Sequence, residues 1–244
     1  MYKFGLIGKH ITYSFSRTYF SKKFNKEGLP FSYDNYDLED IDQLQDILKN
    51  TPQLKGLNVT IPYKEAVIPF LDSLSKKARK IGAVNTIRIT KKGRLKGYNT
   101  DCYGFKKSIT PLLEAHHKQA LILGTGGASK AILYVLKQLD INYTFVSRQP
   151  SEQSEYTYGS LTKEIIEQYQ VIINCTPLGT YPKIDECPDI PYHAITDRHL
   201  LYDLVYNPEL TKFLKLGREQ GAKISNGLQM LELQASKSWS IWND

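Results

Sequence analysis

The chain has 244 residues, 41% of them hydrophobic and 23% charged, which is the usual balance of a globular protein and leaves room for one large domain or two smaller ones. It has no apolar run near the roughly 20 residues of a membrane span, no signal-peptide pattern at its N-terminus, and no CxxC or HExxH motif among its three cysteines and five histidines, so we expect a cytoplasmic protein without a disulfide framework or a metal site. The net charge of +7 comes from lysines scattered in short pairs, a distribution that suits attraction of small anions better than binding of nucleic acid.

The first hundred residues alternate between strand and helix patterns. In the order strand, helix, strand, helix, strand and helix, the expected elements are residues 2–8, 16–29, 31–38, 40–50, 56–61 and 73–82. Residues 84–90 and 94–99 then flank a Lys-Lys-Gly turn as a β-hairpin. This alternation predicts an α/β domain with a largely parallel sheet.

The segment GLNVTIPYKE, residues 56–65, places a cation at the start of a helix. Pro62 suits the first helical position, and Thr60 lies where a capping hydroxyl is useful. A lysine at position 64 then meets the positive end of the helix dipole, which together with partial burial disfavours its charged form. Because a group that gives up its proton readily can act in acid–base catalysis, Lys64 is a candidate for proton transfer. The alternative is an ordinary ion pair with Asp101.

A second α/β pattern occupies the rest of the chain. Its expected strands are residues 118–124, 141–148, 169–177 and 199–206, and its expected helices are residues 128–140 and 226–244. The last two strands are apolar runs of the kind that a parallel sheet buries on both faces. We place the domain boundaries near Tyr103 and Ser225.

The sequence LILGTGGASKA, residues 121–131, joins a buried strand to a helix through a glycine-rich turn. Gly124 permits the tight turn, and Gly126 lets a pyrophosphate approach the backbone. Gly127 and Ala128 permit close helix packing, and the helix N-terminus faces the anion. A strand before the turn, a helix after it and a second strand at the right distance favour a dinucleotide site. The alternative is a turn that only reverses the chain.

The strand after the glycine turn ends in Ser147 and Arg148. An NAD site usually has Asp or Glu at this offset, to hold the ribose hydroxyls. A hydroxyl and a guanidinium suit a 2′-phosphate instead, so the sequence predicts NADP rather than NAD. The alternative is a surface arginine at the end of a strand.

Polar residues gather at the ends of the elements in the first domain. They are Ser14, Ser16, Asn58, Thr60, Lys64, Asn85, Asn99, Thr100 and Asp101. Each of them has a plain structural alternative, such as capping a helix or closing a turn. Because ligands collect at the carboxyl ends of strands in open α/β sheets, the whole set suits a polyhydroxylated small molecule.

A series of motifs runs through nearly the whole chain. They are SxS at 14–16, NVTIPYK at 58–64, GAVNT at 82–86, GYNTD at 97–101, GTGGASKA at 124–131, NCTPLG at 174–179, DLVYNP at 203–208 and GLQMLELQA at 227–235. In these motifs and in their order the chain resembles the shikimate dehydrogenase family. The resemblance implies NADPH-dependent reduction of 3-dehydroshikimate to shikimate, on the route to chorismate and the aromatic amino acids. It also implies a substrate domain, residues 1–103 with a returning terminal helix at 226–244, and a Rossmann-type NADP-binding domain, residues 104–225.

The resemblance assigns roles to single residues. On the substrate side, the resemblance implies that the catalytic pair is Lys64 and Asp101. It implies that the substrate carboxylate is bound by Ser14, Ser16 and Tyr206. The implied ligands of the hydroxyls or ring are Thr60, Asn85 and Gln234. On the cofactor side, the resemblance implies that the pyrophosphate is bound by Gly124, Gly126, Gly127 and Ala128. It implies that Arg148 binds the 2′-phosphate. The implied lining of the rest of the cleft is Asn174, Thr176 and Gly179.

The chain departs from the family pattern in three places. Arg17 stands where a proline commonly follows the second serine, and no second basic residue follows Arg148. The third is the segment between Arg148 and Tyr169, which is short for the family, so we expect different loops on the adenosine side. The absence of a second basic residue bears on the choice of cofactor. The second departure keeps open an NAD-using quinate/shikimate dehydrogenase. The net charge motivates another alternative, a non-catalytic NADP-sensing or nucleic-acid-binding protein. The presence of both Lys64 and Asp101 favours an enzyme, monomeric or homodimeric, that acts on a small molecule and binds neither nucleic acid nor a membrane.

Overall fold

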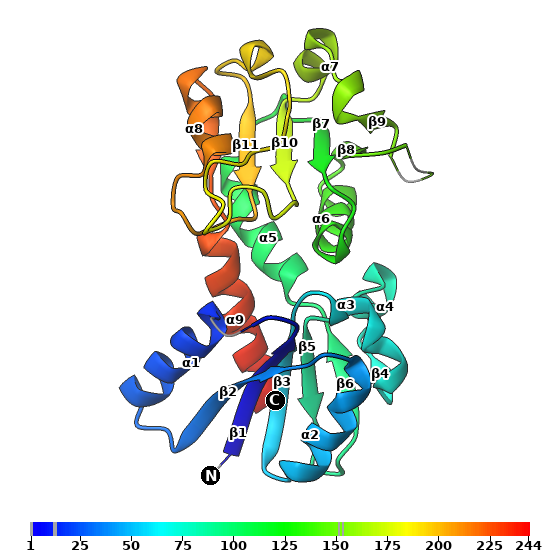
Figure 1. The fold of residues 1–244 in the computed structure, drawn as a ribbon, viewed down its shortest axis with the longest axis vertical. Coiled ribbons are helices and arrows are strands. Elements are labelled where there is room, and N and C mark those ends of the chain that lie inside the picture. The colour runs from blue at the N-terminus through cyan, green and yellow to red at the C-terminus, as the bar shows by residue number, and fades with distance from the viewer. Residues whose placement is uncertain (1, 12–13, 151, 153) are drawn as a thin grey trace. The chain divides into compact units, whose positions relative to one another are not determined.

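The computed structural model describes residues 2–11, 14–150, 152 and 154–244. Contacts between residues divide the chain into two compact units, Met1–Thr100 with Gln234–Asp244 and Asp101–Leu233. Each unit contains a six-stranded sheet (Figure 1), so the expected α/β class with mostly parallel sheets is confirmed. The division differs from the boundaries expected near Tyr103 and Ser225. The assignment of one unit to a substrate and the other to a cofactor stays a prediction.

The first unit is built on a mixed sheet with the strand order β2-β1-β3-β5-β6-β4. β1 pairs with β2 and β3 in parallel, whereas β5 and β6 form the antiparallel hairpin that the sequence predicts. The strands are β1 (Tyr2–Gly8), β2 (Phe31–Asp37), β3 (Leu54–Val59), β4 (Ser73–Leu74), β5 (Thr86–Ile89) and β6 (Leu95–Tyr98). The helices are α1 (Phe15–Lys26), α2 (Leu44–Asn50), α3 (Tyr63–Ala66) and α4 (Lys76–Ile81), with the 3₁₀ turns η1 (Ile41–Gln43) and η2 (Ile68–Phe70).

Both faces of the first sheet are covered. Successive side chains of a strand point to opposite faces, so neighbouring residues of β3 contact different elements. On β3, Leu57 and Val59 pack into a core cluster with α2 and α4. Gly56 and Asn58 face the other way, toward the end of α9 (Leu228–Asn243). Trp242 of α9 lies against Gly56, where any side chain would collide with its indole, and it donates its indole N–H to the Ile87 carbonyl at 2.9 Å. The polar face of β3 is therefore buried under a helix from the far end of the sequence.

The second unit is built on a sheet whose pairs are all parallel, with the strand order β12-β11-β10-β7-β8-β9. The strands are β7 (Gln119–Leu123), β8 (Asn142–Ser147), β9 (Tyr156–Thr157), β10 (Val171–Asn174), β11 (Leu200–Asp203) and β12 (Lys223–Ser225). The helices are α5 (Asp101–Ile109), α6 (Gly127–Gln138), α7 (Lys163–Gln168), α8 (Lys212–Glu219) and the start of α9, with the 3₁₀ turns η3 (Thr110–Leu112), η4 (Tyr158–Ser160) and η5 (Tyr192–Ala194). The chain winds outward in both directions from the β7–β10 pair, and this reversal is where doubly wound folds bind dinucleotides.

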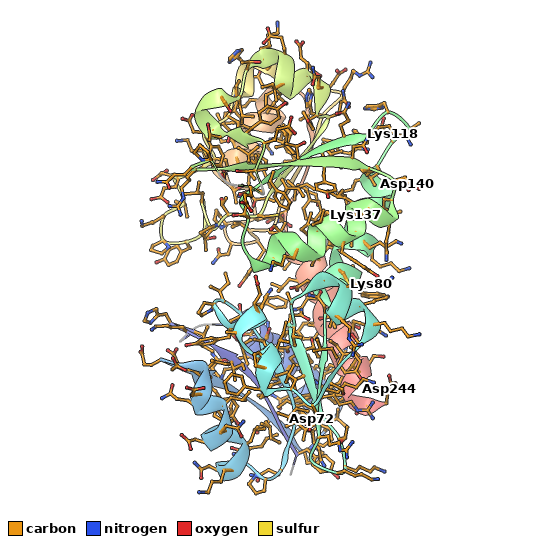
Figure 2. The ribbon with its side chains drawn as sticks, turned by 90° about the vertical axis from the view of Figure 1, so that its right-hand side faces the viewer. Asp72, Lys80, Lys118, Lys137, Asp140 and Asp244 are labelled. Atoms are coloured by element: carbon orange, nitrogen blue, oxygen red, sulfur yellow. The ribbon has the colours of Figure 1, made fainter. Side chains whose placement is uncertain are left out.

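Local signals explain most element ends. Ser14 caps α1 and Ser75 caps α4, so residues 73 and 74 form a short strand rather than the helix start that the sequence suggests. Gly82 ends α4 with a φ of 72°. After α6, Asp140 turns the chain into β8 with a φ of 52° (Figure 2). Among the helices that the structure describes, none has the length and apolarity to cross a bilayer.

Candidate functional site

The glycine turn leads into a long helix and leaves open space beside Gly126. Gly124 follows β7 with a φ of 96°, a conformation that favours glycine. Gly126 caps the twelve-residue helix α6, and a Cβ added there would meet no atom within 4 Å. The Ser129 amide and hydroxyl both donate to the Gly126 carbonyl, at 2.9 and 2.7 Å, which closes the first helical turn. The backbone amides of this helix start are suited to binding an anion such as a pyrophosphate.

A second turn, after β10, packs against the glycine turn. Asn174 ends β10, and its side-chain oxygen accepts from the Thr176 amide at 3.0 Å and from the Thr176 hydroxyl at 2.6 Å. A Cβ on Gly124 would lie 2.9 Å from the Thr176 methyl, so the absence of a side chain on Gly124 permits this packing. Gly179 follows with a φ of 88°. The structure thus brings together Gly124, Asn174 and Thr176, three of the residues that the family resemblance places on the cofactor side.

Asp203 stabilises the turn after β10 through a hydrogen bond with Asn174. The sequence patterns predict no separate role for this residue. Its carboxylate accepts from the Asn174 side-chain amide at 2.9 Å, the Val205 amide at 3.0 Å and the Thr211 hydroxyl at 2.6 Å. Burial raises the pKa of Asp203 to about 6, although these hydrogen bonds act in the opposite direction. An acidic residue in the otherwise apolar run LLYDLV was the signal in the sequence.

Ser147 and Arg148, the two residues that the sequence predicts at a 2′-phosphate, differ in their surroundings in the loop after β8. The Ser147 hydroxyl donates to the Gln149 carbonyl and lies 2.7 Å from the Ser154 hydroxyl, so it helps to fold the loop. Arg148 is exposed. Of the two side chains, the guanidinium is therefore the more available for a ligand.

In the first unit, three predicted substrate ligands lie in buried positions next to other polar groups. Asn85 and Gln234 both contact the Thr100 hydroxyl, at 3.0 and 3.4 Å. The Ser14 hydroxyl accepts from the Arg17 amide at 3.1 Å. Ser14 rather than Ser16 therefore caps α1. Ser16 is also buried.

Lys64 lies in the single helical turn α3, and its carbonyl accepts from the Val84 amide at 2.7 Å. The expected hydroxyl cap by Thr60 is wrong, because Pro62 occupies the N-cap position and the Thr60 carbonyl, not its hydroxyl, accepts from Tyr63. The dipole of a helix sums over its aligned peptides, so the single turn α3 has a smaller dipole at Lys64 than a longer helix would have.

Two further predicted residues, Asp101 and Tyr206, belong to the second unit, whereas Lys64 belongs to the first. Asp101 is the buried first residue of α5. Tyr206 follows β11 and is next in sequence to Val205, whose amide donates a hydrogen bond to the Asp203 carboxylate. Within the described ranges, three or more His, Cys, Asp or Glu side chains nowhere gather into a possible metal site.

Comparison with known proteins gives matches over the full length. Residues 6–87 match the family model of the shikimate dehydrogenase substrate binding domain. The chain is 38% identical over 253 residues to "Shikimate dehydrogenase (NADP(+))" of Clostridium botulinum strain Hall, covering 99% of this chain and 96% of that protein. It is similar to the structure of a chorismate mutase/shikimate 5-dehydrogenase fusion protein from Clostridium acetobutylicum, with 37% identity, a TM-score of 0.86, and coverage of 100% and 92% of the two chains. It is also similar to a quinate dehydrogenase from Corynebacterium glutamicum in complex with NAD, with 25% identity, a TM-score of 0.87, and coverage of 99% and 93%.

The pKa of Asp203 leads to a prediction about stability. Between about pH 4 and pH 6 the unfolded chain gives up this proton while the folded chain keeps it, because the folded pKa is about 6 against an ordinary 3.8. The free energy of unfolding should therefore fall by up to about 3 kcal/mol as the pH rises through this range. Asp203→Asn, which keeps the shape without the charge, should lack that fall.

Urea unfolding followed by circular dichroism at pH 4, 5, 6 and 7 measures the difference between wild type and variant. Other titrating groups cancel in this difference. Asp197→Asn, at an exposed position of the same unit, serves as control and should follow the wild-type curve. Identical pH dependence in all three proteins would contradict the prediction.

Proposed function

The chain belongs to the shikimate dehydrogenase family, and from this premise we propose that it catalyses the reversible NADPH-dependent reduction of 3-dehydroshikimate to shikimate. This reaction is a step toward chorismate and the aromatic amino acids. The observation that carries the proposal is the 38% identity, over 99% of the chain, to a relative named shikimate dehydrogenase (NADP(+)). The chain also has a lysine at position 64 and an aspartate at position 101, as the proposed proton transfer requires.

The cofactor residues fit a dinucleotide phosphate. The space beside Gly126 at the start of α6 suits a pyrophosphate, which would be held by Gly124, Gly126, Gly127 and Ala128. The exposed guanidinium of Arg148 would hold the 2′-phosphate, with Ser147 shaping its loop. Asn174, Thr176 and Gly179 would line the rest of the site. When bound, NADPH supplies the hydride.

The substrate residues offer donors and acceptors that match an acid with several hydroxyl groups. Ser14 and Ser16, with Tyr206, would hold the carboxylate. Thr60, Asn85 and Gln234 would bind hydroxyls or orient the ring. Because a polyhydroxylated ligand has few apolar contacts to give, its affinity depends on the fixed orientation of these groups.

Lys64 and Asp101 would manage the proton. Reduction of a ketone by hydride leaves an alkoxide, and the Lys64 ammonium, within hydrogen-bond reach of that oxygen, would protonate it. Asp101 would fix the ammonium and could share the proton, as coupled groups do. In the reverse direction the same pair would remove the proton from the alcohol. Lys64 and Asp101 are therefore proposed as catalytic residues.

The assay that tests the proposal follows absorbance at 340 nm when purified protein receives NADP⁺ and shikimate. We expect absorbance to rise with this pair and to rise much less with quinate or NAD⁺. The alternative of an NAD-using quinate/shikimate dehydrogenase is motivated by the missing second basic residue after Arg148 and by the similarity to the quinate dehydrogenase. Faster turnover of quinate with NAD⁺ would favour it. No absorbance change, together with salt-sensitive DNA binding, would favour a nucleic-acid-binding protein.

Lys64→Ala should lower kcat by about 10²–10⁴ while changing the KM for shikimate much less, because general acid–base catalysis contributes that range to the rate. Steady-state kinetics measure both constants. Lys91→Ala is the matched control, since Lys91 is exposed in the hairpin turn, at the sheet edge opposite the carboxyl ends of β1 and β3. Near-normal turnover by the Lys64 variant would rule out its catalytic role.

Arg148→Gln should raise the KM for NADP⁺ by roughly 10–100-fold and leave the KM for NAD⁺ nearly unchanged, because it removes a charge-assisted contact that only the 2′-phosphate makes. The same measurement on Arg198→Gln is the control, since Arg198 is exposed ahead of β11, at the opposite edge of the sheet. Equal weakening of both cofactors would show that Arg148 does not recognise the phosphate.

A further inference from the structure

A fully buried hydroxyl group on α9 contacts several polar groups of the first unit. The Ser238 side chain has no exposed surface. Its oxygen lies 2.8 Å from the Thr86 hydroxyl, 3.1 Å from the Asn58 side-chain amide and 3.2 Å from the Thr100 hydroxyl, and it donates to the Gln234 carbonyl at 3.0 Å. These residues come from the ends of β3, β5 and β6 and from α9 itself.

The chemistry of the neighbours fixes the direction of two of these hydrogen bonds. A backbone carbonyl only accepts, so Ser238 is the donor to Gln234. The Asn58 amide nitrogen only donates, and its oxygen accepts from the Tyr33 hydroxyl at 2.8 Å. The hydroxyls of Thr86 and Thr100 each form a hydrogen bond with Ser238 in which either oxygen can be the donor. Ser238 therefore joins the backbone of α9, the Asn58 amide and two threonine hydroxyls.

Two proposed substrate ligands, Asn85 and Gln234, contact Thr100, which is hydrogen-bonded to Ser238. The Thr100 amide donates to the Asn85 side-chain oxygen at 2.7 Å, and the Asn85 side-chain amide donates to the Thr100 hydroxyl at 3.0 Å. The Thr100 hydroxyl also contacts the Gln234 side chain at 3.4 Å. Ser238 contacts this group through the Thr100 hydroxyl and through the Gln234 carbonyl.

We propose that Ser238 is a positioning residue for the substrate: without touching it, Ser238 holds Asn85 and Gln234 in the orientation that binds the substrate's hydroxyl groups. This inference rests on the proposed function. The Thr86 hydroxyl already donates to the Asn85 side-chain oxygen, at 3.2 Å. Without the Ser238 hydroxyl, Thr86 would be free to move toward that oxygen, and the Asn85 side chain would lose its fixed position on the Thr100 amide.

The test compares Ser238→Ala with Ser236→Ala, because Ser236 is an exposed serine on the same helix. Ser238→Ala should raise the KM for shikimate roughly 5–50-fold, the range expected when buried donors lose their acceptor. The KM for NADP⁺ should stay within about twofold, since Ser238 and its partners belong to the first unit. Ser236→Ala should change neither constant. A purely structural role would not produce this split between the two KM values.

A second variant keeps the inference testable if Ser238→Ala does not fold. Thr86→Val removes the hydroxyl that is hydrogen-bonded to Ser238 and nearly keeps the side-chain volume, so it should raise the KM for shikimate in the same way. Where both single variants fold, the double variant should be no worse than either alone, because both remove the same link.

The outcomes separate the two proposals. An active wild type whose Ser238→Ala and Thr86→Val variants keep the normal KM for shikimate would overturn the positioning role alone. Equal increases in both KM values would overturn it as well, since they would indicate general damage to the fold. A folded wild type that does not oxidise shikimate would overturn the proposed function and the positioning role with it.

Discussion

Polar side chains that are buried at the carboxyl ends of strands must find hydrogen-bond partners inside the protein, because an unsatisfied group keeps the full cost of leaving water. This constraint organises the candidate sites in both units. In the first, Thr86, Thr100 and Ser238 satisfy one another within 3.2 Å. In the second, Asn174 lies between Asp203 and Thr176 and bonds to both. Each candidate site therefore has an inner layer of buried polar residues next to the residues that are proposed to face a ligand.

The two inner layers differ in charge, and the difference has a physical reason. The first is made of hydroxyls and amides, which can satisfy one another without the cost of burying an ion. Neutral donors and acceptors also match the hydroxyl groups of a polyol. The second contains the Asp203 carboxylate, whose raised pKa records the cost of its burial. In return the carboxylate accepts three hydrogen bonds and ties Asn174, Val205 and Thr211 to one point.

Sequence patterns revealed what depends on neighbouring residues and missed what depends on distant ones. The alternation in GLNVTI predicted a strand, and the glycines of GTGGA predicted a turn into a helix, because both signals are local. The short strands β9 and β12 have too few residues to show a period. The sequence also placed Asn58 among the polar residues at the ends of elements. Only the fold shows that α9 covers this residue, since its partner Ser238 is 180 residues away.

The spacing along α9 explains how Gln234, a proposed substrate ligand near the chain end, is held against the first sheet. Gln234, Ser238 and Trp242 are four residues apart, so they lie on one stripe of the helix and face the same sheet. Trp242 anchors this stripe by packing on Gly56 and donating to the Ile87 carbonyl. One turn earlier, the Ser238 hydroxyl joins the helix to the ends of the strands. Another turn earlier stands Gln234, whose direction is therefore fixed twice, first by hydrophobic contact and then by hydrogen bonds. Because helix ends fray when nothing holds them, the indole packed at the end of α9 also keeps the preceding two turns in place, and these turns carry the proposed substrate ligand Gln234.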